Sequence, residues 1–164
     1  MLFIFINYCY YILSSHNKIM KKEYKNLNIE DLKNLAKEIK NILNSKKERE
    51  DRTFIIFLKG DLGSGKTTFT KEIGKEFGIE EDIISPTFIL RKDYKNIIHI
   101  DGYRFEKEEE GKVLELEKEI EGGGKIIIIE WPERFVNALN IKPDIILEFK
   151  IASENSRDIT IFFE

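Results

Sequence analysis

Eight consecutive residues, Gly60-Asp61-Leu62-Gly63-Ser64-Gly65-Lys66-Thr67, follow the pattern G-x-x-x-x-G-K-[ST] that cradles nucleotide phosphates. Glycines suit such a loop because its backbone must turn so that successive N–H groups point at phosphate oxygens. A helix beginning near Lys66 would add unpaired N–H groups and a partial positive charge. Lys66 can carry its charge to the β- and γ-phosphates, and the Thr67 hydroxyl can ligate magnesium. The pattern therefore predicts binding of a nucleoside triphosphate with Mg²⁺ and favours its hydrolysis.

The elements around this loop follow from the spacing of apolar residues. Helical spacing over 29–43, with Asn28 as N-cap, predicts an amphipathic helix. The run 53–58 (TFIIFL) is typical of a buried parallel strand. A helix is predicted from Lys66 to about Phe77, with Gly78 as its C-cap. This strand–loop–helix context favours a nucleotide site over a glycine-rich turn with an incidental lysine.

Further along the chain, a helix is predicted over 106–121, together with five more strands. These strands cover residues 88–94, 97–100, 126–129, 145–151 and 159–163. The last two are expected to pair antiparallel, joined by 152–158, and to close the sheet. The pattern predicts the α/β class, with a P-loop NTPase fold whose mostly parallel central sheet is flanked by helices and carries antiparallel C-terminal strands.

Two acids at the ends of apolar runs are candidates for the metal site. Asp101 follows 97–100 (IIHI) and Glu130 follows 126–129 (IIII), at the sheet edge where open α/β sheets bind ligands. Glu130 has the better Walker-B shape, so we predict that it serves magnesium together with Thr67. For each acid the alternative is a solvated carboxylate at a strand end.

Other residues narrow the chemistry. No N-K-x-D or T-K-x-D segment occurs, so ATP is favoured over GTP. His99 lies inside an apolar run and is interpreted as a hydrogen-bonded core histidine rather than a catalyst. A small-molecule kinase is one alternative, although the six arginines are scattered and form no evident lid. An ATP-gated binding module without turnover is the other.

Composition bounds the class of protein. A length of 164 residues suits one domain, and a net charge of -3 gives no strongly basic surface for autonomous binding to nucleic acid. The single cysteine, Cys9, excludes an internal disulfide and a cysteine-cluster metal site, and fits a cytoplasmic protein.

The first nineteen residues have a different character from the rest. The apolar run 2–13 is too short to span a membrane, and it lacks both the basic residues and the cleavage site of a secretory signal. We predict that residues 1–19 are a leader outside the domain, that translation starts at Met20, and that residues 20–164 form one ATPase domain. A short membrane-surface anchor is the alternative.

Several segments together resemble one family. They are 60–68 (GDLGSGKTT), 85–88 (SPTF), 99–104 (HIDGYR) and 129–133 (IEWPE). Their order and spacing resemble the bacterial TsaE (YjeE-like) family over about residues 29–164. The resemblance implies an ATPase of tRNA threonylcarbamoyladenosine biosynthesis. It would act on a transferase subunit and its paralogous scaffold. The sequence has no basic stripe with interleaved aromatics, so we expect contact with tRNA only through these partners. Arg104 is the only arginine in a matched motif near the site, so we also expect slow turnover in the isolated chain and a change when the partners bind.

The resemblance also implies roles for individual residues. Phosphate contacts would come from the loop and its first helical turn, that is, from Gly60, Gly63, Ser64, Gly65, Lys66, Thr67 and Thr68. Thr87 would be a switch residue that senses the γ-phosphate, and Asp101 would orient the attacking water or complete the metal shell. Trp131 and Arg157 would lie against the nucleotide. The catalytic set is therefore Lys66, Thr87 and Asp101.

Two positions depart from the family pattern. Gly102 stands where the family usually has leucine, so we expect a looser D-G-Y-R turn. Leu32 stands where members tend to have threonine near the adenine, so the base contacts are expected to differ.

Overall fold

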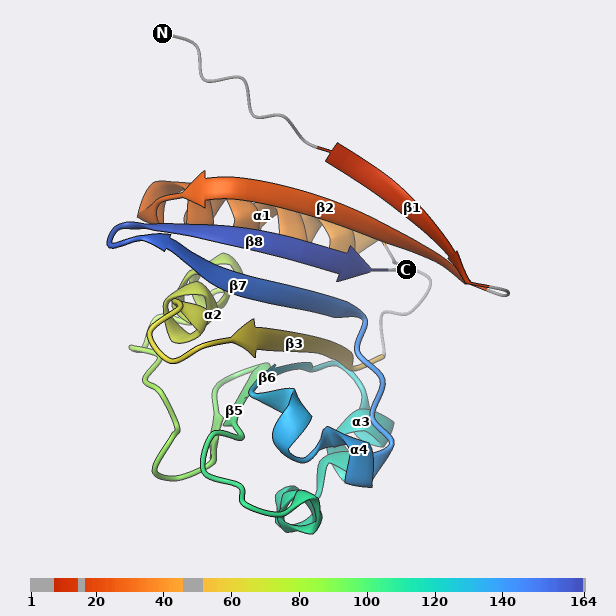
Figure 1. Ribbon diagram of the computed structural model, residues 1–164. Coiled ribbons are helices and arrows are strands. Elements are labelled where there is room, and N and C mark those ends of the chain that lie inside the picture. Colours follow the sequence, from red (N-terminus) through yellow and green to blue (C-terminus); the bar gives the residue numbers. More distant parts are fainter. Residues whose placement is uncertain (1–7, 15–16, 46–51, 164) are drawn as a thin grey trace, which may run out of the picture.

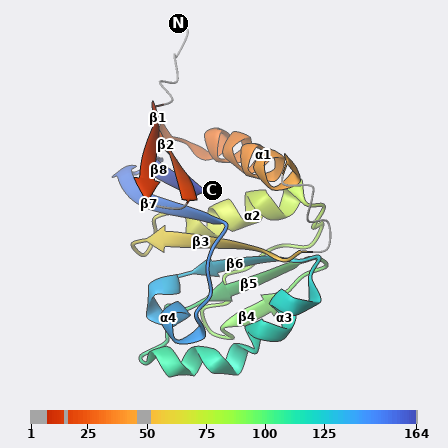
Figure 2. The same ribbon diagram turned by 90° about the vertical axis from the view of Figure 1, so that its right-hand side faces the viewer.

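The computed structural model describes residues 8–14, 17–45 and 52–163, which form one eight-stranded sheet with helices on both faces (Figures 1 and 2). The strand order is β1-β2-β8-β7-β3-β6-β5-β4. The strands are β1 (Tyr8–Ser14), β2 (Asn17–Leu27), β3 (Phe54–Gly60), β4 (Arg91–Asp93), β5 (Ile97–Asp101), β6 (Ile126–Glu130), β7 (Ile145–Ser153) and β8 (Ser156–Phe163).

The four central strands β7, β3, β6 and β5 are parallel to one another, and antiparallel strands extend the sheet on both sides. The predicted fold class is therefore confirmed. The central strands are apolar on both faces because helices cover both, as parallel sheets require.

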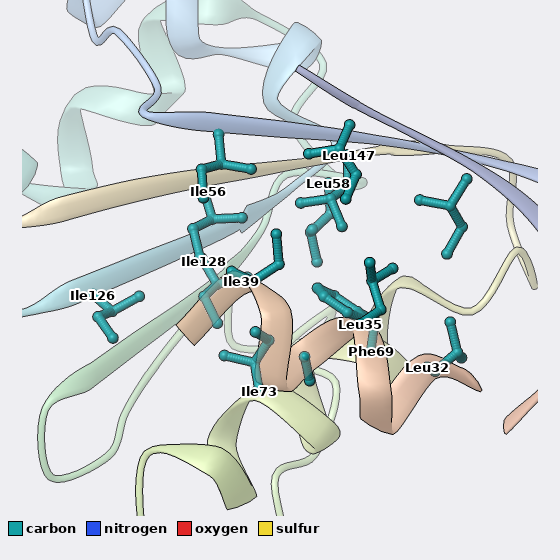
Figure 3. Packing of buried hydrophobic residues seen from close by; sticks show 14 of the residues in the cluster. Leu32, Leu35, Ile39, Ile56, Leu58, Phe69, Ile73, Ile126, Ile128 and Leu147 are labelled. Atoms are coloured by element: carbon teal, nitrogen blue, oxygen red, sulfur yellow. The ribbon is translucent and has the colours of Figure 1, made fainter. Parts of the chain in front are cut away.

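Two hydrophobic cores lie on opposite faces of the sheet. On one face α1 (Ile29–Ser45) and α2 (Lys66–Glu76) pack on alternate strand residues such as Ile56, Leu58 and Ile128 (Figure 3). On the other face Ile55, Phe57 and their neighbours meet shorter helical segments. These are η2 (Glu108–Leu114), α3 (Leu116–Gly122), η3 (Pro132–Arg134) and α4 (Val136–Leu139).

The helices beside the loop begin and end almost where the sequence predicts. The Asn28 side chain accepts hydrogen bonds from the Glu30 and Asp31 amides at 2.8 and 3.2 Å, so the predicted N-cap of α1 is confirmed. Gly78, with φ +75°, follows the end of α2 in the left-handed conformation typical of a helix stop.

The prediction that the last two strands close the sheet is wrong. β2 pairs with β8, and β1 pairs with β2 beyond it, so the β7–β8 hairpin lies inside the sheet. The stretch of β2 that pairs with β8 is mostly polar, which is why its sequence did not predict a strand. The hairpin is also tighter than predicted, because only Glu154 and Asn155 separate its strands.

Two further predictions are corrected locally. The strand predicted over 88–94 is only β4, because the Pro86 carbonyl accepts hydrogen bonds from the amides of Ile89 and Leu90 and holds a turn. The helix predicted over 106–121 is interrupted at Glu115, which has φ +47°. There Arg91 Nη1 donates to the Leu114 carbonyl at 2.8 Å, and the chain continues in two pieces, η2 and α3.

Part of the predicted leader belongs to the described chain. Residues 8–14 form β1, and residues 17–19 begin β2, while residues 1–7 and 15–16 lie outside the described residues. The start at Met20 stays a prediction. Within the described ranges, no helix has both the length and the apolar character needed to cross a membrane.

Candidate nucleotide site

The loop from Gly60 to Thr67 connects β3 to the first turn of α2. Gly60, Gly63 and Gly65 have φ of +138°, +74° and +99°, a backbone conformation that side chains disfavour. A Cβ on Gly60 would lie 2.5 Å from the Phe149 carbonyl oxygen, whereas a Cβ on Gly63 would meet nothing within 4 Å. Glycine is therefore required at position 60 because a side chain would clash with the Phe149 carbonyl. At position 63 glycine is favoured by the backbone conformation, and the open space beside it could hold phosphates.

A cavity of about 270 Å³ opens over this loop. It is lined by Leu62, Gly63, Gly65, Lys66, Thr67, Thr68, Ser85, Thr87, Asp101, Tyr103, Glu130, Trp131 and Arg157. All the predicted site residues except Gly60 and Ser64 line this cavity. Leu62, Ser85 and Tyr103 were missed, although Ser85 and Tyr103 stand in the S-P-T and D-G-Y-R segments and could have been named from them.

Lys66 is buried at the floor of the cavity. Its Nζ donates hydrogen bonds to the carbonyls of Gly60 at 2.7 Å and Asp61 at 2.9 Å, and lies 4.3 Å from the centre of the Trp131 ring. Burial lowers the pKa of the Lys66 ammonium, and the charges of Glu130 and Asp101 oppose this shift. The ammonium is thus held by neutral acceptors that anionic phosphate oxygens could replace.

Glu130 is hydrogen-bonded to the threonine of the loop. Thr67 Oγ1 donates to Glu130 Oε1 at 2.8 Å, and His99 Nε2 lies 2.9 Å from the same oxygen. Within 8–14, 17–45 and 52–163, no group of three or more His, Cys, Asp or Glu side chains could hold a metal alone. The donor set fits Mg²⁺ bound through a hydroxyl, a carboxylate and phosphate oxygens of a nucleotide.

Asp101, at the end of β5, is buried and accepts hydrogen bonds on both carboxylate oxygens. The Tyr103 amide donates to Oδ1 at 2.9 Å. The hydroxyl groups of Thr87 and Ser85 both donate to Oδ2, and they lie 2.6 Å from each other. The S-P-T segment is therefore hydrogen-bonded to Asp101, and Ser85, Thr87 and Asp101 line the cavity together.

Trp131 lines the cavity close to Lys66. It has φ +55°, its amide donates to the Leu58 carbonyl at 3.2 Å, and its ring lies 5.2 Å from the ring of Tyr103. This turn directly after β6 places the indole beside the Lys66 ammonium, and the contact of Trp131 with a nucleotide stays a prediction.

Arg157 lines the cavity but donates hydrogen bonds to five backbone carbonyls. Nε and Nη2 bond the loop carbonyls of Ser64 at 3.0 Å and Gly63 at 3.1 Å. Nη1 bonds the hairpin carbonyls of Ser153, Glu154 and Ser156 at 2.9, 3.2 and 2.8 Å. Arg157 therefore joins the β7–β8 hairpin to the loop, and its contact with a nucleotide stays a prediction.

The two departures from the family pattern have different outcomes. Gly102 is buried, and a Cβ there would lie 2.7 Å from the Phe135 ring, so the D-G-Y-R turn is closely packed rather than loose. Leu32 is in the core between α1 and the sheet and does not line the cavity.

Comparison with known proteins agrees with this geometry. The family model described as "Threonylcarbamoyl adenosine biosynthesis protein TsaE" matches residues 27–159. The curated proteins named "tRNA threonylcarbamoyladenosine biosynthesis protein TsaE" include similar ones from Rickettsia typhi and Aquifex aeolicus. The first is 41% identical over 129 residues, covering 76% of this chain and 88% of the relative. The second is 35% identical over 140 residues, covering 81% and 90%.

A solved structure has the same architecture. The crystal structure of Bacillus subtilis YdiB superposes with a TM-score of 0.64 at 26% identity, covering 91% of this chain and 88% of that one. The family model spans the loop, the S-P-T and D-G-Y-R segments and Glu130, and residues from each of these line one cavity. The chain therefore belongs to the TsaE family.

Proposed function

We propose that this protein is a Mg²⁺-dependent ATPase of tRNA threonylcarbamoyladenosine biosynthesis. It would act on a transferase subunit and its paralogous scaffold, which modify the adenosine next to the anticodon in tRNAs reading codons that begin with A. The ATPase activity is proposed because one cavity is lined by Lys66, Thr67, Asp101 and Glu130. The biosynthetic role rests on family membership.

Each of these residues has a separate task in the proposed hydrolysis. Lys66 exchanges the carbonyls of Gly60 and Asp61 for phosphate oxygens. Glu130 holds the proton of the Thr67 hydroxyl, so that the lone pairs of this hydroxyl face the cavity. A bound Mg²⁺ ion supplies positive charge to the phosphate oxygens. Asp101 orients the attacking water once its bonds to Thr87 and Ser85 are released.

Few positive charges are available at the site, which supports slow turnover in the isolated chain. Among the arginines of the described ranges, only Arg157 lines the cavity, and its donors are engaged by backbone carbonyls. An arginine that stabilises the transferring phosphoryl group contributes roughly 10³–10⁵ in rate. A kinase-like lid of arginines is likewise not formed by the residues that the structure describes.

The acidic balance of the chain supports indirect contact with tRNA. A net charge of -3 offers little attraction to a phosphate backbone, so we propose that tRNA is reached only through the two partner proteins. The proposed location is the cytoplasm, where tRNA modification and a reduced Cys9 are both expected.

Phosphate release measured with and without the two partner proteins tests this function. We expect slow Mg²⁺-dependent release from ATP alone, a changed rate with the partners, and no release from the Lys66→Ala variant. Transfer of phosphate to an added small-molecule acceptor would replace this proposal with a kinase. ATP-dependent association with the partners without any release would replace it with a binding module.

A further inference from the structure

His99 is fully buried in β5 and contacts the acid of the proposed metal site. Its exposed fraction is 0%, and its Nε2 lies 2.9 Å from Glu130 Oε1. The same oxygen accepts the Thr67 hydroxyl at 2.8 Å. Glu130 Oε1 therefore contacts both Thr67, which lines the cavity, and His99, which does not.

The strand register explains why this contact matters. Asp101 is the direct partner of Glu130 across the parallel pair β5 and β6, and His99 is the partner of Ile128. Two carboxylates at paired positions repel each other. The Glu130 carboxylate is oriented by its contacts with Thr67 and with His99, its diagonal neighbour on β5. Asp101 forms separate hydrogen bonds, with Thr87, Ser85 and the Tyr103 amide.

An imidazole is a costly choice if the position serves only packing. Ile97 lies two positions before His99, on the same face of β5, and shows that this face accepts a buried aliphatic side chain. His99 Nδ1 is buried without a hydrogen-bond partner. A carboxylate oxygen only accepts, so the Nε2–H of the ring is the donor in the contact with Glu130 Oε1. The ring therefore makes one described bond, to Glu130.

We propose that His99 is a positioning residue for the metal site. It fixes the Glu130 carboxylate so that Oε1 accepts the hydrogen bond of Thr67 Oγ1, which would leave the lone pairs of this hydroxyl available to ligate Mg²⁺. His99 itself touches neither metal nor nucleotide. This inference rests on the proposed function, because it assumes that the nucleotide binds with Mg²⁺.

The test is a Mg²⁺ titration of fluorescent-nucleotide binding in the full chain. For His99→Ala we expect the Mg²⁺ concentration at half-saturation to rise about 10–100-fold, the usual effect of losing a residue that supports a metal ligand. Nucleotide affinity in EDTA should stay within about twofold of the unsubstituted protein. His99→Gln, whose amide N–H can donate to Glu130, should recover most of the Mg²⁺ affinity.

Two controls separate positioning from general damage. Ile98→Ala removes a buried side chain from the same strand and should lower the melting temperature without moving the Mg²⁺ midpoint. If His99→Ala does not fold, His99→Leu fills the space without a donor and should give the same shift.

An unchanged midpoint in the folded variant, or equal shifts in His99→Gln and His99→Leu, would overturn the proposal. If the unsubstituted chain binds nucleotide without any Mg²⁺ dependence, the proposed function itself fails, and the role of His99 fails with it.

Discussion

Arg157 Nε donates a hydrogen bond of 3.0 Å to the carbonyl oxygen of Ser64, in the middle of the phosphate loop. The C=O and N–H of a trans peptide point in opposite directions. The Arg157 bond on the Ser64 carbonyl therefore turns the Gly65 N–H away from the guanidinium. Arg157 Nη1 also donates hydrogen bonds to three carbonyls of the β7–β8 hairpin, so this one side chain links the loop to the sheet.

Arg157→Ala should weaken binding of ADP and ATP by about tenfold, because a hydrogen bond from a charged donor contributes roughly 1.5–3 kcal/mol and water partly replaces it. Arg157→Lys should recover little, since an ammonium cannot reproduce the planar fork. Isothermal titration with both nucleotides is the measurement. Lys150→Ala, which removes an exposed cation from the same hairpin, is the control and should bind normally. A loss confined to ATP would instead indicate direct contact with the γ-phosphate.

Substitutions of Lys66 and Asp101 should differ in their effect on nucleotide binding. Lys66→Ala deletes the charge at the cavity floor and should abolish both nucleotide binding and hydrolysis. Asp101→Ala should abolish hydrolysis but keep binding within a few fold, because this carboxylate faces Thr87 and Ser85 rather than the loop. Phosphate release and equilibrium binding on the same samples separate the two. Asp82→Asn, an exposed acid outside the cavity, should leave both quantities unchanged, and full hydrolysis by Asp101→Ala would remove Asp101 from the mechanism.

The phosphate loop was predictable because its signal is local. Glycine spacing, a preceding apolar run and a following helical pattern all lie within about twenty-five residues. The family resemblance named Asp101 and Thr87 as separate site residues, but their hydrogen bond is seen only in the structure. Ser85 stands in the same S-P-T segment and could have been named with Thr87.

The contacts of His99 and Arg157 could not be predicted in the same way. The first depends on the register between β5 and β6, which sets a histidine diagonally opposite an acid thirty-one positions away. The second depends on a hairpin that turns through only two residues. β2 was missed for another reason: between Met20 and Leu27 its apolar side chains are too sparse for a strand pattern.

A chain that starts at Met20 should fold and bind nucleotide. Residues Met20–Leu27 would still pair with β8, and Tyr24 and Leu27 would stay in the core. Only β1, at the edge of the sheet, would be lost entirely. Thermal melting should change by a few degrees at most, whereas a chain that starts at Asn28 should be strongly destabilised because it loses the whole β2–β8 pairing and the core side chains of Tyr24 and Leu27. Equal destabilisation of both chains would contradict this prediction. Binding of the full chain, but not the shorter one, to lipid vesicles would support the anchor alternative.

Gly102 and Phe135 should be coupled energetically, because the ring of Phe135 occupies the space that a side chain at position 102 would need. A Cβ on Gly102 would lie 2.7 Å from this ring and 2.8 Å from the Trp131 carbonyl, and a Cβ on Gly111 would lie 2.5 Å from the ring's other edge. Gly102→Leu, which introduces the family's usual residue, should therefore cost about 1–3 kcal/mol of unfolding free energy by overpacking. Denaturant unfolding is the measurement.

The matched control is Gly122→Ala, a glycine whose Cβ would meet nothing within 4 Å, and it should change stability little. Combining Gly102→Leu with Phe135→Ala should cost less than the sum of the two single substitutions, because the leucine can fill the space left by the ring. Since Gly102 follows Asp101 directly, the single variant should also slow phosphate release, and the double variant should regain part of it. Strict additivity in stability would mean that the ring and the glycine are independent, and that the close packing of this turn has another origin.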